Sequence, residues 1–172
     1  MKRRAFMGKS CACLGGVIAL KAAGLASQTA PAATAVPAAG TMAAATAEHL
    51  NAGFWSSDSL FLSALKHLKQ PQDLVRISTP FMGGMVKKDL CGFLTGGYMA
   101  IGLFAGVKDG ADKEGRKRCA LLAKEYYEWW AKNYPLHCGE INKPEAECNF
   151  KLMAQRASDF LQAMFERETK KG

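Results

Sequence analysis

The residues of this sequence that could carry chemistry are its cysteines. Thiolates bind zinc and iron–sulfur clusters, and two thiols can cycle between a dithiol and a disulfide. No Cys-x-x-Cys pair occurs, so the ligands of a metal would have to converge from separate segments. No Cys-x-x-Cys-His motif is present either, which excludes covalent c-type haem by that motif. The six cysteines are Cys11, Cys13, Cys91, Cys119, Cys138 and Cys148.

Cys138 and Cys148 lie in one short stretch, with Gly139 and Pro144 between them. Such a loop could bring two thiols within bridging distance, and closing it would stabilise the fold by about 2–3 kcal/mol. His137 precedes Cys138 and could replace a thiol as a metal ligand, or could simply face solvent. A disulfide, a reversible thiol pair and a metal or cluster site therefore all stay open here.

Cys91 stands where a helix is expected to begin, after Lys87, Lys88 and a glycine-rich turn. Positive charge and free backbone N–H groups at such a point stabilise a thiolate, although Asp89 opposes the effect. The other interpretation is a buried and inert cysteine.

Glycines recur in the helix that is expected after Cys91. In a helix interior each one costs about 1 kcal/mol relative to alanine. This pattern indicates close approach of a second helix or of a cofactor to the backbone, and helix packing is the commoner cause. The glycines are Gly92, Gly96, Gly97 and Gly102.

The first residues, Met-Lys-Arg-Arg-Ala-Phe-Met-Gly-Lys, resemble a twin-arginine export signal whose paired arginines are Arg3 and Arg4. The apolar stretch that follows is about half of the roughly 20 residues that a bilayer span needs. We therefore expect a signal peptide and cleavage region over 1–35, an Ala/Pro-rich tether over 36–48 and a helical domain over 49–170. The expected location is the periplasm, without a stable transmembrane segment.

The formal net charge of +8 owes much to this signal. Five basic residues and no acidic residue precede Ala30, so the rest of the chain carries +3. That balance gives no reason to expect a nucleic-acid partner. The sequence also lacks a P-loop, a nucleophile elbow and a His-Glu-x-x-His motif. Four cysteines remain after the signal, an even number that in an oxidising compartment first suggests disulfides.

Apolar residues recur at helical spacing after the signal, and no window alternates as a half-buried strand would. Caps, prolines and glycines divide this part into segments at about 58–69, 73–78, 88–104, 112–133 and 144–168. The sequence thus predicts one all-α domain, a small helical bundle of about five helices. Consecutive aromatic residues at 126–130 cover more than one helix face, which leaves a homodimer open.

Two stretches of the sequence resemble a known family. Residues 81–85 read Phe-Met-Gly-Gly-Met, with Gly83 and Gly84 in the turn, and residues 90–103 read Leu-Cys-Gly-Phe-Leu-Thr-Gly-Gly-Tyr-Met-Ala-Ile-Gly-Leu. With the later cysteines, this order resembles the redox family named for its pattern C_GCAxxG_C_C, over roughly residues 50–168. The resemblance implies redox chemistry at Cys91, Cys138 and Cys148. A related domain in split-Soret cytochromes implies electron transfer in some relatives.

The chain departs from the family pattern at two points. The first family cysteine is expected near residues 54–60, which read Phe-Trp-Ser-Ser-Asp-Ser-Leu, and Phe93 stands where the motif usually has alanine. Cys119 is an extra cysteine that does not match the missing one. A shared cofactor would need Cys119, a serine or a carboxylate such as Asp58 as its fourth ligand, unless the site has been lost.

We therefore expect an exported redox-active or electron-transfer protein with an unknown redox partner. Its cysteines would bind an iron–sulfur cluster or another metal, or would cycle as thiols. Twin-arginine substrates cross the membrane folded, often with a cofactor loaded in the reducing cytoplasm, where thiols stay available as ligands. The alternative is a cofactor-free binding or accessory protein with structural cysteines.

Overall fold

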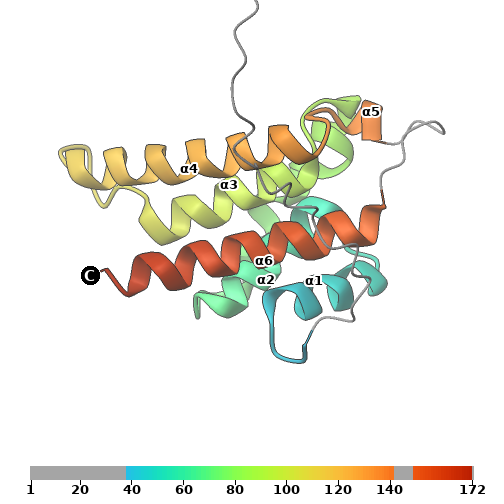
Figure 1. Cartoon of the computed structure of the whole chain (residues 1–172), viewed down its shortest axis with the longest axis horizontal. Coiled ribbons are helices and arrows are strands. Elements are labelled where there is room, and N and C mark those ends of the chain that lie inside the picture. The colour runs from blue at the N-terminus through green and yellow to red at the C-terminus, as the bar shows by residue number, and fades with distance from the viewer. Residues whose placement is uncertain (1–37, 142–148, 172) are drawn as a thin grey trace, which may run out of the picture. The chain divides into compact units, whose positions relative to one another are not determined.

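The computed structural model describes residues 38–141 and 149–171, which form a helical domain (Figure 1). The described residues contain no β-strand, only an isolated antiparallel bridge between Leu90 and His137, so the all-α prediction is confirmed. The α-helices are α1 (Met42–Asn51), α2 (Ser56–His67), α3 (Gly92–Ala105), α4 (Lys113–Asn133), α5 (Cys138–Ile141) and α6 (Phe150–Thr169).

Two expectations from the sequence concern export and membranes. The predicted signal peptide, with Arg3 and Arg4, lies outside the described residues. Among the helices that the structure describes, none combines the length and the apolar character needed to cross a bilayer.

Three short turns of helix join α2 to α3. Two are 3₁₀ helices, η1 (Gln72–Ile77) and η2 (Thr79–Phe81). The third, η3 (Gly84–Lys88), is one wide turn in which the Asp89 N–H donates to the Gly84 carbonyl (2.9 Å). The short helix predicted at 73–78 is therefore a 3₁₀ helix.

The start of α3 differs from the prediction, because the helix expected from residue 88 begins only at Gly92. Met85, Val86 and Lys88 have φ angles of 53°, 63° and 59°. L-residues rarely adopt this left-handed conformation, and a right-handed helix does not continue through it. The chain must leave the turn before α3 can start.

The tether predicted over 36–48 extends too far, because α1 begins at Met42. Thr41 caps this helix with its hydroxyl. Alanine is the best helix former, and small side chains let α1 lie close to α6, where the Ser158 hydroxyl donates to Thr46 (2.8 Å). An alanine-rich stretch too short to be helical in isolation thus becomes helical against a partner helix.

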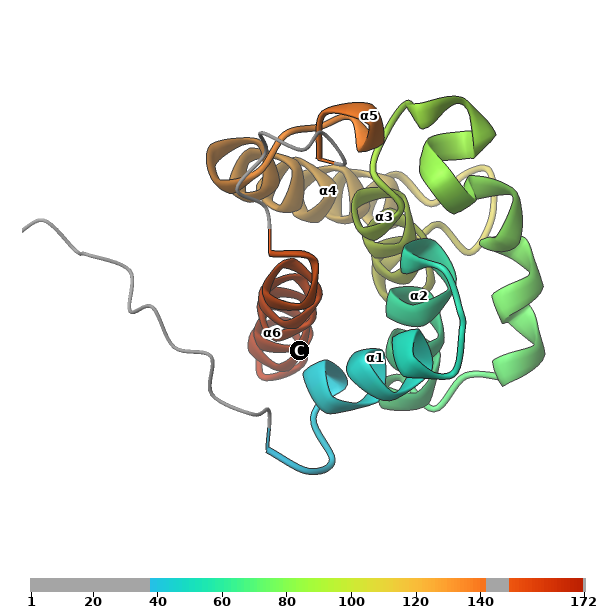
Figure 2. The same ribbon diagram turned by 90° about the vertical axis from the view of Figure 1, so that its right-hand side faces the viewer.

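α2, α3 and α6 begin at the same end of the domain (Figures 1 and 2). At that end the rings of Phe93 and Phe150 lie 4.9 Å apart. At the other end, Phe104 and Phe165 lie 4.8 Å apart, and His67 of α2 stacks on Phe165. The three helices therefore point the same way, so their N-termini gather at one end.

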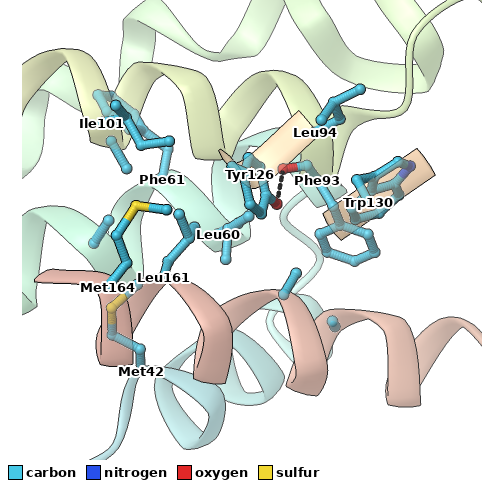
Figure 3. Packing of buried hydrophobic residues seen from close by; sticks show 14 of the residues in the cluster. Met42, Leu60, Phe61, Phe93, Leu94, Ile101, Tyr126, Trp130, Leu161 and Met164 are labelled. Atoms are coloured by element: carbon cyan, nitrogen blue, oxygen red, sulfur yellow. Dashed lines mark hydrogen bonds between the residues drawn. The ribbon is translucent and has the colours of Figure 1, made fainter. Parts of the chain in front are cut away.

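Aromatic side chains join α3, α4 and α6 in the core. Tyr126 and Trp130 of α4 are fully buried, and the Tyr126 hydroxyl donates to the carbonyl oxygen of Phe93 (3.0 Å; Figure 3). Trp129 stacks on Phe160 of α6 at 4.5 Å. Much of the aromatic run at 126–130 thus belongs to the core.

Tyr126→Phe tests how this core depends on pH. Burial, with smaller contributions from Cys91, Tyr98 and Tyr134, raises the pKa of the Tyr126 phenol well above its usual value of 10. The unfolded chain loses this proton near pH 10 and the folded chain keeps it. The stabilisation is therefore complete below pH 10 and is lost as the pH rises further. We expect Tyr126→Phe to lower the free energy of unfolding by about 1 kcal/mol near neutral pH, because a hydrogen bond is lost. We also expect the free energy of unfolding of this variant to fall less above pH 10.

Urea unfolding between about pH 8 and pH 11 measures both effects. Tyr127→Phe is the matched control, because Tyr127 neighbours Tyr126 on α4 but is 38% exposed. The control should behave as the wild type. If the free energy of unfolding fell equally at alkaline pH in Tyr126→Phe and in the wild type, Tyr126 would not be the group responsible.

Candidate functional site

Two of the cysteines meet at the isolated bridge. Cys91 is the N-cap of α3 and is buried, with 3% of its surface exposed, and its N–H donates to the Leu136 carbonyl (2.8 Å). Cys138 opens α5, and its N–H donates to the Asp89 carbonyl (2.7 Å). These two hydrogen bonds form the bridge between Leu90 and His137. Two cysteines far apart in the sequence therefore lie on its two paired segments.

Cys91 and Cys138 lie diagonally across the bridge, because Cys91 follows Leu90 and Cys138 follows His137. Diagonal positions across antiparallel chains lie about 7–8 Å apart, with Cβ atoms somewhat closer. A disulfide needs Cβ atoms about 3.5–4.5 Å apart. The two thiols are thus neighbours that require a backbone shift, a third thiol or a bridging group to be connected.

The bridge also brings His137 to Asp89. Their Nδ1 and Oδ1 atoms lie 2.9 Å apart, and both side chains are about half exposed. A carboxylate on Nδ1 fixes the orientation of an imidazole, as second-shell carboxylates do for metal-bound histidines. His137 is therefore oriented by Asp89, beside Cys138 in the chain.

The start of α2 packs directly on the start of α3. A Cβ atom at Gly92 would collide with the Ser56 hydroxyl, and one at Gly96 would lie 2.7 Å from the Ser57 carbonyl oxygen. Helix packing is thus what these two glycines serve here. The segment in which the first family cysteine is expected lies next to Cys91, with serines in its place.

Ser57 is fully buried in this contact. Its hydroxyl finds no hydrogen-bond partner among the described residues. Sequence reasoning included a serine only as a general substitute for the missing cysteine, and no signal in the sequence indicated which serine would face α3. Asp58, the other suggested substitute, accepts a hydrogen bond from the buried Ser78 hydroxyl (2.7 Å), which ties the segment after α2 to this helix.

Cys119 is separated from the other two cysteines along the bundle. α3 and α4 are antiparallel, since Tyr126 contacts Phe93 whereas Arg118 lies over the ring of Phe104. Cys119 lies seven residues before Tyr126, or about 10 Å along the helix axis. This free, partly exposed thiol of α4 therefore lies toward the C-terminal end of α3, away from Cys91.

Cys148 lies outside the described residues. The next residue, Asn149, caps α6 by accepting from the Leu152 N–H (3.0 Å), and Phe150 then packs on Phe93. Among the described residues, no group of three or more Cys, His, Asp or Glu side chains is placed to hold a metal ion. The described donors thus do not form a metal site on their own.

The glycine-rich turn closes the site from one side. Gly84 has a φ of 68°, and a Cβ atom there would lie 2.7 Å from the Cys138 Cβ atom. Gly84 therefore lets the turn approach Cys138. The left-handed Val86 is a β-branched outlier that is 65% exposed, and strain of this kind is concentrated at functional sites.

Helix dipoles favour negative charge at this end of the domain. α2, α3 and α6 all begin here, and each N-terminus carries a partial positive charge. The C-terminus of α4 lies at the same end, since Trp130 packs near Phe93, and it opposes part of the effect. The three N-termini outnumber the one C-terminus, so the helix dipoles leave a net partial positive charge at this end.

Fold and site together define a helical protein with two cysteines held where several helices begin. Residues 54–166, more than half of the chain, match the family described as "Putative redox-active protein (C_GCAxxG_C_C)". The chain belongs to this family, which supports a general redox role. Comparisons with curated proteins and with solved structures gave no match.

A pair of alanine substitutions in α3 tests the close packing of α2. Gly96→Ala should lower the free energy of unfolding by about 1–3 kcal/mol, because its Cβ atom meets the Ser57 backbone. Gly102→Ala should raise it by about 0.5–1 kcal/mol, because nothing lies within 4 Å of the added atom and alanine favours the helix. Urea unfolding of both variants measures this contrast. Equal effects at the two positions would show that Gly96 serves no close contact.

Proposed function

We propose that this protein is an exported thiol-based redox protein and that Cys138 is the thiol that exchanges with its partner. The observation that carries the proposal is the bridge, which holds the partly exposed Cys138 beside the buried Cys91. The short spacing to Cys148 makes that residue the pairing partner of Cys138. Cys91 is then a third thiol at the start of α3 that helps to position the pair.

The proposed reaction is a two-electron exchange. The thiolate of Cys138 attacks a disulfide of an oxidised partner and forms a mixed disulfide, releasing one partner thiolate. The thiolate of Cys148 then attacks the Cys138 sulfur and releases the second. The partner gains two electrons and, after protonation, two protons, and this chain loses them as one S–S bond forms.

An iron–sulfur cluster or another metal is the alternative. It is favoured by the buried hydroxyl of Ser57, a residue packed on Gly92 and Gly96, because a hydroxyl without a partner among the described residues could face a ligand. At this site the described residues supply the two thiols of Cys91 and Cys138, and nowhere among them is there a group of three donors placed to hold a metal ion. They do not fit such a group without Cys148, so we derive no step through it.

Redox titration tests the thiol proposal. Full-length protein is reduced, separated from reductant and equilibrated in dithiothreitol buffers of graded potential. Free thiols are counted at each step, and the oxidised form is mapped by peptide mass spectrometry. We expect one two-electron couple and a disulfide between Cys138 and Cys148. Cys138→Ser should abolish the couple, because the exchanging thiol is gone.

Cys119→Ser is the matched control, because Cys119 is a free cysteine of α4 that lies toward the C-terminal end of α3, away from Cys91. The redox couple should persist in this variant. A couple that survives Cys138→Ser would contradict the proposal. So would stoichiometric iron with visible absorption in protein isolated anaerobically, which would favour the cluster. A disulfide that no buffer in the series reduces would favour structural cysteines.

Export is tested by replacing Arg3 and Arg4 with lysine, which keeps the positive charge but removes the paired arginines. In a bacterial host with a twin-arginine pathway, the wild-type chain should appear in the periplasmic fraction, and the double variant should stay in the cytoplasm. Immunoblots of the two fractions provide the measurement. Equal export of both chains would contradict this part of the proposal.

A further inference from the structure

A groove with a volume of about 860 Å³ lies between the end of α1 and the first turns of α6. Leucine and alanine side chains form much of its wall. Three aromatic side chains line it while remaining well exposed: Phe54 (41%), Trp55 (56%) and Phe150 (40%). Aromatic side chains gathered in a concave surface of this size are typical of a ligand site.

The groove lies beside the start of α3, where Cys91 is the N-cap. Ser56 lines it and also contacts Gly92, the residue after Cys91. Asn149 lines it as well, and is the residue that follows Cys148 in the sequence. A molecule bound in the groove would therefore lie next to the start of α3, where Cys91 of the proposed redox site stands.

The polar lining indicates an uncharged ligand. Lys151 is the one charged side chain among the described residues that line the groove, and it is exposed. The other polar groups include the neutral amides of Asn51, Asn149 and Gln155. Amide N–H groups donate hydrogen bonds to carbonyl oxygens, and aromatic walls favour a flat apolar ring.

We infer that the groove binds a small, neutral aromatic dicarbonyl compound of the quinone class. Its volume falls within the roughly 300–1,000 Å³ of small-molecule sites. The binding half of the inference stands on the groove alone, and the redox half rests on the proposed function. There, two S–H bonds break and one S–S bond forms, while two electrons and two protons convert both quinone carbonyls into hydroxyls.

Binding is tested on full-length protein with ubiquinone-1, a benzoquinone whose ring positions are all substituted, so that it resists addition of thiols. Equilibrium dialysis should give saturable binding of one molecule per chain. Ala47→Phe places a large side chain in the groove and should weaken binding at least tenfold. Ala44→Phe is the matched control, because Ala44 is on the same helix but lines a different cavity, next to α2, and it should bind as the wild type.

Trp55→Ala is a second variant that keeps the test decisive if Ala47→Phe does not fold, because Trp55 is mostly exposed. It should also weaken binding. Absence of saturable binding to the wild type would overturn the inference. Unchanged binding in a folded Ala47→Phe and in Trp55→Ala would do the same, as would binding of dodecanoate in the groove in preference to the quinone.

Two further measurements separate this inference from the proposed function. Cys138→Ser should still bind ubiquinone-1, because the groove does not include Cys138. Reduced, reductant-free wild type should convert the quinone to hydroquinone, one per two thiols lost, and Cys138→Ser should not. Quinone binding without a thiol couple would contradict the proposed function and support the groove as a quinone site. A normal couple without quinone binding would do the reverse.

Discussion

The contact between the first turns of α2 and α3 is the constraint on which the rest of the site depends. Because Gly92 and Gly96 have no side chains, the start of α2 lies against the α3 backbone. That contact sets the N-termini of the two helices side by side, and α6 joins them through the ring of Phe150 on Phe93. Cys91, as the N-cap of α3, therefore sits where several helix dipoles converge.

The sequence predicts the main helices well, because their apolar spacing and their caps are local signals. The glycines of α3 also indicated a close approach, although not its partner, since only the fold shows that α2 is the helix they meet. The bridge at Leu90 was not predictable, because one pair of residues carries no alternating pattern. The start of α1 at Met42 was missed for a related reason: alanine-rich sequence becomes helical only when α6 covers it.

Placement of the candidate residues required the fold as well. The family resemblance left Cys119, a serine and a carboxylate such as Asp58 as alternative substitutes for the missing cysteine. The antiparallel packing of α3 and α4 places Cys119 toward the C-terminal end of α3, away from Cys91. Asp58 accepts a hydrogen bond from the Ser78 hydroxyl. Ser57, in contrast, is buried against α3 with its hydroxyl unpaired among the described residues. A buried hydroxyl without a partner costs about 1–3 kcal/mol, so a ligand that paired with it would bind more favourably.

Exposure decides how a partner can reach these thiols. Cys91 is 3% exposed, so a protein disulfide would have to open the domain to touch it. Cys138 is partly exposed at the edge formed by the turn at Gly84, where the backbone is already strained. A macromolecular partner therefore has access to Cys138 first. A small flat molecule has a second route through the groove, whose wall includes Ser56 in contact with the start of α3.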